Sequence, residues 1–209
     1  LSDMGVTFLL RPKMYGCHMY VLLSFQETLL YTVIIIKQKR KPVTMKYVAY
    51  YTSPLGALRM IEEGNALTHL SLAGEETLFA EFPEGTVEQR STPLLDTAKA
   101  QLREYFQGTR QHFDLPLHPS GTAFQQKVWD ALRTIPYGET RSYKEIAIQI
   151  QNPKGCRAVG MANNRNPIMI VIPCHRVIGS NGTLVGYAGG LKVKEWLLEH
   201  EKMRWYYGT

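Results

Sequence analysis

The chain has 209 residues, of which 44% are hydrophobic and 20% are charged, and its net charge is +6. These values are ordinary for a soluble globular protein and leave room for one large or two small domains. Its 3 cysteines are too few for a disulfide framework and form no Cys-x-x-Cys pair, which favours a reducing cytoplasm. The 6 histidines show no metal-ligand spacing, so we predict neither a metal nor a cofactor.

Charge is unevenly distributed along the chain, and residues 1–44 are basic on balance. Lys and Arg outnumber Asp and Glu over residues 122–209, whereas residues 45–121 are acidic on balance. A basic surface supplies sequence-independent affinity for phosphates, so this asymmetry favours a polyanion as the partner of the C-terminal part. A basic surface that serves only solubility is the alternative, and charge alone does not decide between them.

Residues 1–44 differ from the rest of the chain. Their apolar stretch, 19–36, contains polar residues such as Glu27 and ends in a basic run. A membrane-spanning helix needs about 20 predominantly apolar residues, and a secretory signal has its basic residues before the apolar stretch. We therefore interpret residues 1–44 as a mis-assigned start or a tail outside the fold and expect no membrane partner. A weak membrane anchor is the alternative.

The next segment is predicted to form strands and a helix. Three strands are expected, separated by polar turns, at 47–52, 57–61 and 66–72. Thr92 is a candidate N-cap for a helix over 93–107, in which apolar residues recur at helical spacing before Gly108. Residues 109–121 link this part to the next.

Capping boxes mark two helix starts in the C-terminal part. Thr122 and Gln125 open a helix with an apolar stripe, and Ser142 and Glu145 open a second. A third helix, rich in small residues, is predicted at 156–164 after a turn that contains glycine. The last two helices resemble a helix-turn-helix, although a plain αα-hairpin in a core would show the same pattern.

The third predicted helix carries small, uncharged residues. Ala158, Gly160, Ala162 and Asn163 allow another surface to approach closely. A helix that enters the major groove of DNA is expected to be basic, whereas small residues and one arginine, Arg157, suit the minor groove. We therefore predict that this helix faces the minor groove.

An unusual cysteine follows an apolar, β-branched run at residues 168–172. After that run come Pro173, Cys174 and the polar pair His175-Arg176. We predict a buried strand that carries the thiol at its end. A free core cysteine is the alternative from base rates, but an imidazole and a guanidinium beside the thiol favour a reactive thiolate.

The sequence Pro-Cys-His-Arg-Val at 173–177 resembles the active-site signature of the O6-alkylguanine-DNA alkyltransferases, which take an alkyl group from damaged DNA onto their own cysteine. Other family landmarks occur in the family's order and spacing, namely Ser142-Tyr143, Arg157-Ala158-Val159-Gly160, Asn166-Pro167, Gly186-Tyr187-Ala188-Gly189-Gly190 and Lys194-Glu195-Trp196-Leu197-Leu198. The resemblance implies an α/β (α+β) fold. A strand-rich, ribonuclease H-like domain (45–121) would precede a mostly helical, winged-helix-like domain (122–209) with a helix-turn-helix.

The resemblance also implies roles around the thiol. Cys174 would accept the alkyl group, and His175 would take the thiol proton through a water. Glu201 would orient the imidazole and favour its protonated, charged form. Neighbouring residues of a strand point to opposite faces, so a bridging water or a turn at Pro173 must supply the geometry. Asn166 would brace the turn and the active-site strand. Without the resemblance, Glu201 would be interpreted as a solvated carboxylate near a helix end.

Further residues are implied to handle the damaged base. Arg157 resembles an arginine that fills the stack after a base is flipped out, and Tyr143 resembles a tyrosine that crowds the 3′ phosphate and donates to the guanine. Taken alone, they would be a surface ion-pair partner and an aromatic near a helix cap. The implied guanine pocket consists of Val171, Tyr187, Ala188 and Gly189. Many relatives have Ser at position 188, so Ala188 leaves the donor to O6 open.

The implied function is single-turnover repair of O6-alkylguanine in double-stranded DNA, with O4-alkylthymine as a further candidate substrate. The thioether product resists hydrolysis, so each molecule would act once. We expect a cytoplasmic monomer. A cysteine hydrolase is an alternative, but its histidine normally lies far from the cysteine in sequence, unlike His175. A non-enzymatic DNA binder is the third option, and catalytically dead relatives lack the cysteine that this chain keeps.

Overall fold

The computed structural model describes residues 44–74 and 86–207, with side chains as far as residue 202. These residues belong to one compact unit, Thr44–Thr209. The predicted leader falls outside the described residues, apart from Thr44 at its end.

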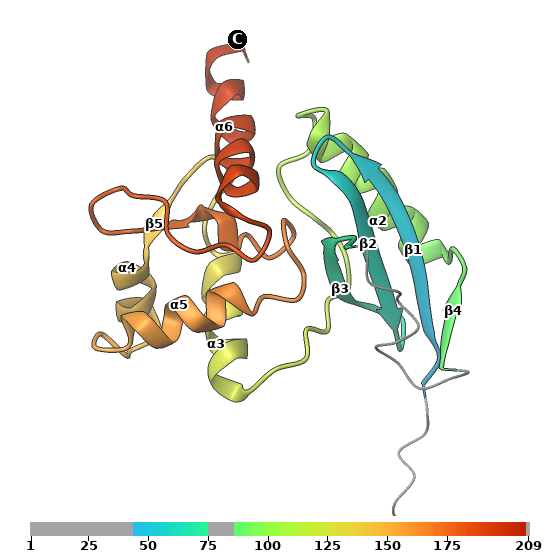
Figure 1. Cartoon of the computed structure of the whole chain (residues 1–209), viewed down its shortest axis with the longest axis horizontal. Coiled ribbons are helices and arrows are strands. Elements are labelled where there is room, and N and C mark those ends of the chain that lie inside the picture. The colour runs from blue at the N-terminus through green and yellow to red at the C-terminus, as the bar shows by residue number, and fades with distance from the viewer. Residues whose placement is uncertain (1–43, 75–85, 208–209) are drawn as a thin grey trace, which may run out of the picture. The chain divides into compact units, whose positions relative to one another are not determined.

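A four-stranded sheet forms the N-terminal half (Figure 1). Its strands are β1 (Lys46–Ser53), β2 (Gly56–Glu63), β3 (Ala66–Leu72) and β4 (Val87–Gln89). The first three correspond to the predicted strands and form an antiparallel meander, and β4, which the sequence did not predict, pairs with β1 in parallel. The turn between β2 and β3 has a φ of +61° at both Gly64 and Asn65, as tight type I′ hairpin turns require.

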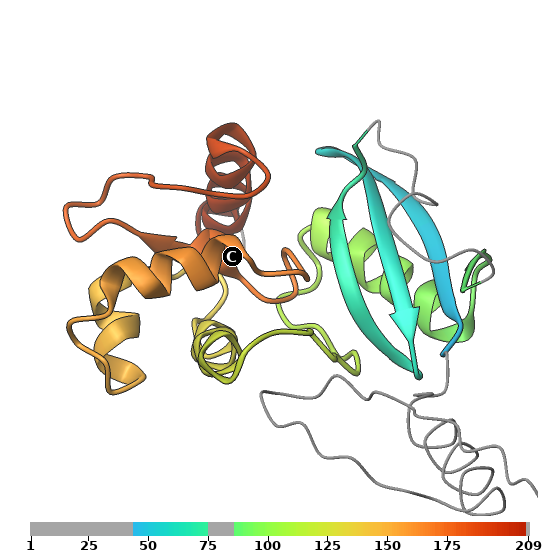
Figure 2. The same ribbon diagram turned by 60° about the horizontal axis from the view of Figure 1, so that its bottom comes forward.

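Helix α2 (Pro93–Phe106) packs on one face of this sheet (Figure 2). It begins where predicted, because Thr92 Oγ1 accepts a hydrogen bond from Leu95 N at 3.1 Å. Its buried side chains at helical spacing are Leu95, Ala98, Leu102 and Tyr105. They share one core with sheet residues such as Leu58 and Met60. Full burial of a leucine contributes about 1.5–3 kcal/mol, so this stripe fixes the helix on the sheet.

Helices dominate the C-terminal half, beside the sheet in both views (Figures 1 and 2). They are α3 (Ala123–Arg133), α4 (Tyr143–Gln149), α5 (Cys156–Asn164) and α6 (Leu191–Tyr207), together with the 3-10 turn η2 (Cys174–Arg176) and a short parallel pair of strands, β5 (Arg141–Ser142) and β6 (Val177–Ile178). A strand-rich half followed by a helical half confirms the predicted α/β (α+β) class.

Both predicted capping boxes are present. At the start of α3, Gln125 N donates to Thr122 Oγ1 (3.3 Å) and Thr122 N donates to Gln125 Oε1 (2.7 Å). At the start of α4, Glu145 N donates to Ser142 Oγ (3.1 Å) and Ser142 N donates to Glu145 Oε2 (2.6 Å). These local bonds satisfy backbone donors that the first helical turn leaves unpaired, so they fix where each helix begins.

Helices α4 and α5 form a helix-turn-helix. They pack on each other, and the connecting turn places Gly155 so close to Asn152 that a Cβ there would lie 2.4 Å from the amide nitrogen. A larger residue at position 155 would require the exposed Asn152 side chain to move. Trp129 Nε1 of α3 donates to Ala162 O at 2.9 Å and fixes α3 against α5.

The apolar run before Cys174 is a turn, so the predicted buried strand is wrong. Ile172 N donates to Ile168 O at 3.0 Å, and Ile170 has a φ of +69°, which a strand does not allow. The run is apolar because it is enclosed, and a short apolar run indicates burial without indicating conformation.

This turn segment rests against the sheet at Leu70 of β3. Leu70 N donates to Pro167 O at 2.8 Å, and Met169 N donates to Leu70 O at 2.9 Å. A second isolated backbone bridge of the sheet joins Leu67 and Leu117. The N-terminal sheet therefore supports the backbone that leads into Cys174.

Candidate active site

Cys174 begins η2, and 4% of its surface is exposed. Asn166 Nδ2 lies 3.0 Å from the thiol Sγ and donates to Ile172 O at 2.8 Å. Asn166 Oδ1 accepts from Ile168 N at 3.0 Å. One asparagine therefore contacts both ends of the turn segment and the thiol itself.

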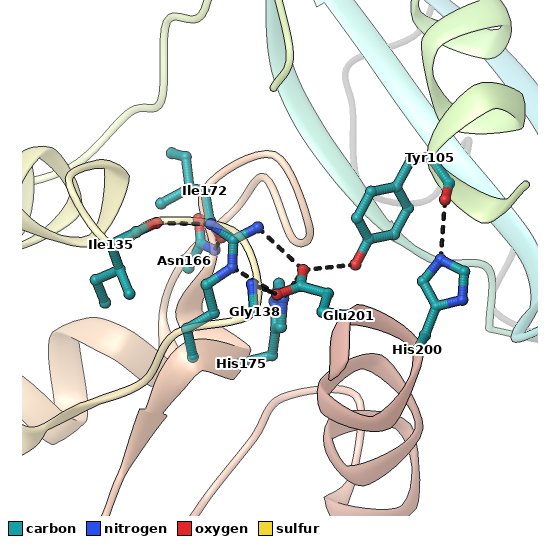
Figure 3. Close-up of polar contacts among 9 residues, drawn as sticks. Tyr105, Ile135, Gly138, Asn166, Ile172, His175, His200 and Glu201 are labelled. Carbon is teal, nitrogen blue, oxygen red and sulfur yellow. Dashed lines mark hydrogen bonds and ion pairs between the residues drawn. The ribbon is translucent and has the colours of Figure 1, made fainter. Parts of the chain in front are cut away.

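His175 is fully buried and directed at α6. Its Nε2 lies 2.8 Å from Glu201 Oε1 (Figure 3). When Nε2 donates its proton to that carboxylate, Nδ1 is the unprotonated nitrogen, and Nδ1 is buried without a hydrogen-bond partner. The imidazole is thus held in the tautomer that can take up a proton at Nδ1.

Glu201 is also fully buried and accepts hydrogen bonds from several segments. Arg176 donates from Nε to Oε2 (2.8 Å) and from Nη2 to Oε1 (3.0 Å). Tyr105 Oη donates to Oε1 (2.8 Å) and Gly138 N to Oε2 (3.2 Å). Burial opposes ionisation, but the bonds from His175 and Arg176 hold the pKa of Glu201 well below its usual range. A solvated carboxylate near a helix end, the alternative from the sequence, is wrong.

Burial disfavours the charged forms of both the thiol and the imidazole. It raises the pKa of the Cys174 thiol, while the Asn166 amide, the Lys194 charge and the Tyr187 hydroxyl partly counteract it. Burial also lowers the pKa of His175, although its carboxylate partner opposes this shift. These directions favour transfer of the thiol proton to the imidazole during the reaction over a preformed ion pair.

Lys194 belongs to the site, although the sequence analysis named it only as part of a family landmark and gave it no role. This buried residue donates from Nζ to Val177 O (2.6 Å) and to Val185 O (2.9 Å), and burial lowers its pKa to about 8. Tyr143 Oη donates to the same Val185 O at 2.9 Å, and burial raises the pKa of Tyr143. Tyr143 and Lys194 thus donate to the same carbonyl oxygen, and Lys194 lies beside the thiol. The sequence signal that could have identified it is the position of this lysine on the face of α6 that points into the core.

The exposed side of α5 carries Arg157 and Ala158, as predicted. Gly160 is half-buried, and a Cβ there would lie 3.8 Å from the Tyr143 ring. Met161, which the sequence did not single out, is 60% exposed on the face it shares with Arg157 four residues earlier. Apolar residues of amphipathic helices normally face the core, so its exposure had no sequence signal.

Asn163 and Ala162 do not belong to this exposed face, which corrects the prediction that Asn163 faces DNA. Asn163 is 1% exposed and its Nδ2 donates to Cys174 O at 3.3 Å, while Ala162 is 2% exposed. Residues three and four positions apart share a helix face, so both follow the buried Val159 inward. Asn163 supports the backbone of the cysteine instead.

The predicted pocket residues lie at different depths. Tyr187 is buried, Val171 and Gly189 are half-buried, and Ala188 is exposed. A Cβ on Gly189 would lie 3.0 Å from the Tyr187 ring, so glycine allows the close approach. Tyr187 Oη lies near enough to Cys174 to lower the thiol pKa but makes no bond of hydrogen-bond geometry. That hydroxyl is free to bind a ligand.

Two protein-family models match the chain. The ribonuclease-like domain of 6-O-methylguanine DNA methyltransferase matches residues 46–119, and the DNA-binding domain of the same protein matches residues 123–203. The methylated-DNA–protein-cysteine methyltransferase of Methanosarcina acetivorans is 49% identical over 156 residues, which cover 74% of this chain and 97% of the relative. The chain belongs to the 6-O-methylguanine DNA methyltransferase family.

Other members of this methyltransferase family are similarly close. The constitutive methylated-DNA–protein-cysteine methyltransferase of Bacillus subtilis is 48% identical over 160 residues, covering 76% of this chain and 97% of the relative. The crystal structure of Mycobacterium tuberculosis O6-methylguanine methyltransferase superposes with a TM-score of 0.68 at 48% identity, covering 77% of this chain and 94% of that one. A structure of Mycobacterium tuberculosis OGT in complex with DNA gives 0.66 at 46% identity, with the same coverage. The family resemblance predicted from the sequence is confirmed.

Residues 44–74 and 86–207 contain neither a cluster of metal ligands nor a membrane-spanning helix. No three His, Cys, Asp or Glu side chains in this part could hold a metal ion together. None of its helices is long and apolar enough to cross a membrane.

Proposed function

We propose that this chain repairs alkylated DNA by moving a methyl or larger alkyl group from guanine O6 to Sγ of its own Cys174. The observation that carries this proposal is the buried thiol, contacted by Asn166 and followed by a histidine that a buried carboxylate holds in the proton-accepting tautomer. Family membership gives this geometry its substrate class.

The transfer is an in-line displacement at the alkyl carbon. His175 takes the thiol proton at Nδ1, through a water, and Glu201 stabilises the imidazolium that forms. The new S–C bond forms as the C–O6 bond breaks, and the guanine keeps that electron pair and takes up a proton. The Tyr143 hydroxyl, which donates to Val185 O in the structure, turns its proton to the guanine and stabilises the leaving base. The thioether is stable, so one molecule repairs one lesion.

The lesion has to leave the DNA stack to reach the buried thiol, at a cost of a few kcal/mol. The exposed face of α5 enters the minor groove, where Arg157 takes the place of the flipped base. Tyr187, Val171 and Gly189 line the guanine pocket, and Ala188 offers no hydroxyl to O6. Tyr187 Oη, buried beside the thiol and free of partners, is the donor that we assign to the base instead.

The protein acts as a cytoplasmic monomer on double-stranded DNA and without a cofactor. Its basic C-terminal half supplies the phosphate affinity, and α5 supplies the contact to the groove. O4-alkylthymine is a second candidate substrate. A separate duplex that contains this base can be tested in the same transfer assay.

Incubation with a duplex containing O6-methylguanine, followed by peptide mass spectrometry, tests this proposal. We expect one methyl group per molecule, on the peptide that holds Cys174. The Cys174→Ala variant should bind the same duplex without transfer, and Cys156→Ala should transfer normally. Methylation of Cys156, or turnover of an ester or peptide substrate, would overturn the proposal.

A further inference from the structure

The N-terminal domain contributes a side chain to the active-site carboxylate. Tyr105, on the last turn of α2, directs its hydroxyl at Glu201 Oε1 over 2.8 Å (Figure 3). Both side chains are fully buried. Among the described residues, the other donors to this carboxylate come from the C-terminal half: Gly138, His175 and Arg176.

A second hydrogen bond fixes the same tyrosine to α6. His200, next to Glu201 in the chain, has its Nε2 2.9 Å from Tyr105 O. The His200 ring stacks on Trp196 at a centroid distance of 4.9 Å, and Trp196 in turn contacts Phe106. Two successive residues of α6 therefore hold Tyr105 by its backbone and by its hydroxyl.

We infer that Tyr105 is a positioning residue for alkyl transfer, through which the ribonuclease-like domain sets the support that Glu201 gives to His175. This inference rests on the proton-transfer roles proposed above. Glu201 Oε1 accepts from Tyr105 and from His175 at the same distance, 2.8 Å. Arg176 Nη2 donates to the same atom at 3.0 Å, so Tyr105, His175 and Arg176 share the charge of one oxygen.

Tyr105 remains a neutral donor at every working pH, because burial and the adjacent carboxylate raise its pKa well above the usual range. Its hydroxyl disperses the negative charge of Glu201 in a fully buried position, where such bonds are strong. Its ring packs on the rings of Phe106, Phe113 and Tyr137 and on the imidazole of His200. Phenylalanine at position 105 would keep these ring contacts and remove the hydroxyl alone.

The expected effect on the reaction has a definite sign. Without the Tyr105 hydroxyl, more of the carboxylate charge acts on the imidazolium of His175, so the pKa of His175 rises. A histidine that is protonated at rest cannot take the thiol proton, so the acid limb of the pH–rate profile moves to higher pH. The ionisable groups that act on His175 and Glu201 are Tyr105, Arg176, Tyr187 and Lys194, and Tyr137 acts on Tyr105. All except Tyr105 stay unchanged in the variant.

The test is the single-turnover rate of the full-length chain with free O6-benzylguanine, measured across pH. Tyr105→Phe should slow transfer by about tenfold or more on the acid side, the magnitude expected for a bond to a charged group. Its acid limb should also move upward. His200→Phe is the matched control, because it removes the bond to the Tyr105 backbone and keeps a ring against Trp196. It should lower the melting temperature and leave the acid limb in place.

A second comparison separates an action through Glu201 from a structural one. In a Glu201→Gln background, Tyr105→Phe should cause little further slowing, since the charge on which it acts is gone. Multiplicative effects of the two substitutions, or a Tyr105→Phe profile that overlays the wild-type profile, would overturn the inference. Failure of the wild-type protein to take the methyl group from the O6-methylguanine duplex would instead overturn the proposed function.

Discussion

At the scale of single residues, the site depends on hydrogen bonds that act against burial. The Cys174 thiol lies where burial raises its pKa, and the Asn166 amide is the largest of the opposing contributions. Glu201 keeps its charge in an equally buried position because donors surround it. The reactivity of the thiol is therefore a property of these neighbours, and their removal can be measured.

We expect Asn166→Ala to raise the pKa of the Cys174 thiol, because the variant loses the bond to Sγ. Thiol alkylation by iodoacetamide, followed across pH, should shift to higher pH. Asn163→Ala is the matched control: it removes a bond to Cys174 O and leaves Sγ untouched. Both variants should lose about 1–3 kcal/mol of stability, since each leaves a buried group unpaired. Equal alkylation profiles for the two would contradict the role of Asn166.

Glu201→Gln should destabilise the protein in a pH-dependent way. Folding lowers the pKa of Glu201, so its stabilising contribution is present above the unfolded value of about 4.3 and is lost as the pH falls below it. Breaking this buried pair should cost about 3–5 kcal/mol near neutrality. Urea unfolding from pH 7 downward should show the gap to wild type narrowing below about pH 4. Glu199→Gln, an exposed position on the same helix, should show no such gap.

At the scale of elements, local signals were reliable where local bonds decide the structure. The capping boxes at Thr122 and Ser142 placed the starts of α3 and α4, because both partners of each bond lie within four residues. The run 168–172 was misjudged because its conformation depends on Leu70, which is distant in sequence.

The same contrast between local and long-range interactions applies to the candidate site. Cys174 and His175 were found from a motif of adjacent residues. Lys194 and Tyr105 were missed because their importance arises from partners far away in the chain. Asn163 was misplaced because small residues indicate close packing without saying which surface lies opposite. Long-range pairing of this kind leaves no pattern within a single short segment.

The exposed face of α5 makes one prediction about base flipping. Arg157→Ala should slow transfer from a duplex by about tenfold or more and leave transfer from free O6-benzylguanine unchanged, because a free base needs no extrusion. Arg165→Ala, which removes a charge at the other end of the helix, is the control. Equal slowing with both substrates would make Arg157 a structural residue.

At the scale of the whole molecule, the uneven charge should appear in DNA binding. Basic residues are in excess in the C-terminal half, which holds α5. Each neutralised phosphate contributes about −0.9 to the slope of log K against log salt concentration. We expect a clearly negative slope in titrations of Cys174→Ala with duplexes of different sequence, and little preference among the undamaged ones. A slope near zero, or tight selection of one undamaged sequence, would indicate a regulator.

The N-terminal and C-terminal halves of the folded unit support each other. This dependence determines which truncated chains should stay folded and active. Leu70 supports the backbone before Cys174, and Tyr105 contacts Glu201. We therefore expect a chain that begins at Met45 to be folded and to transfer methyl groups at the full-length rate, since the compact unit begins at Thr44. A chain that begins at Thr122 should lose most of its activity, because both of these supports are removed.

Melting curves and single-turnover assays of the two truncated chains measure their folding and their transfer rates. Aggregation of the longer one would place residues 1–44 within the fold, and full activity of the shorter one would show that the sheet and α2 are dispensable for transfer.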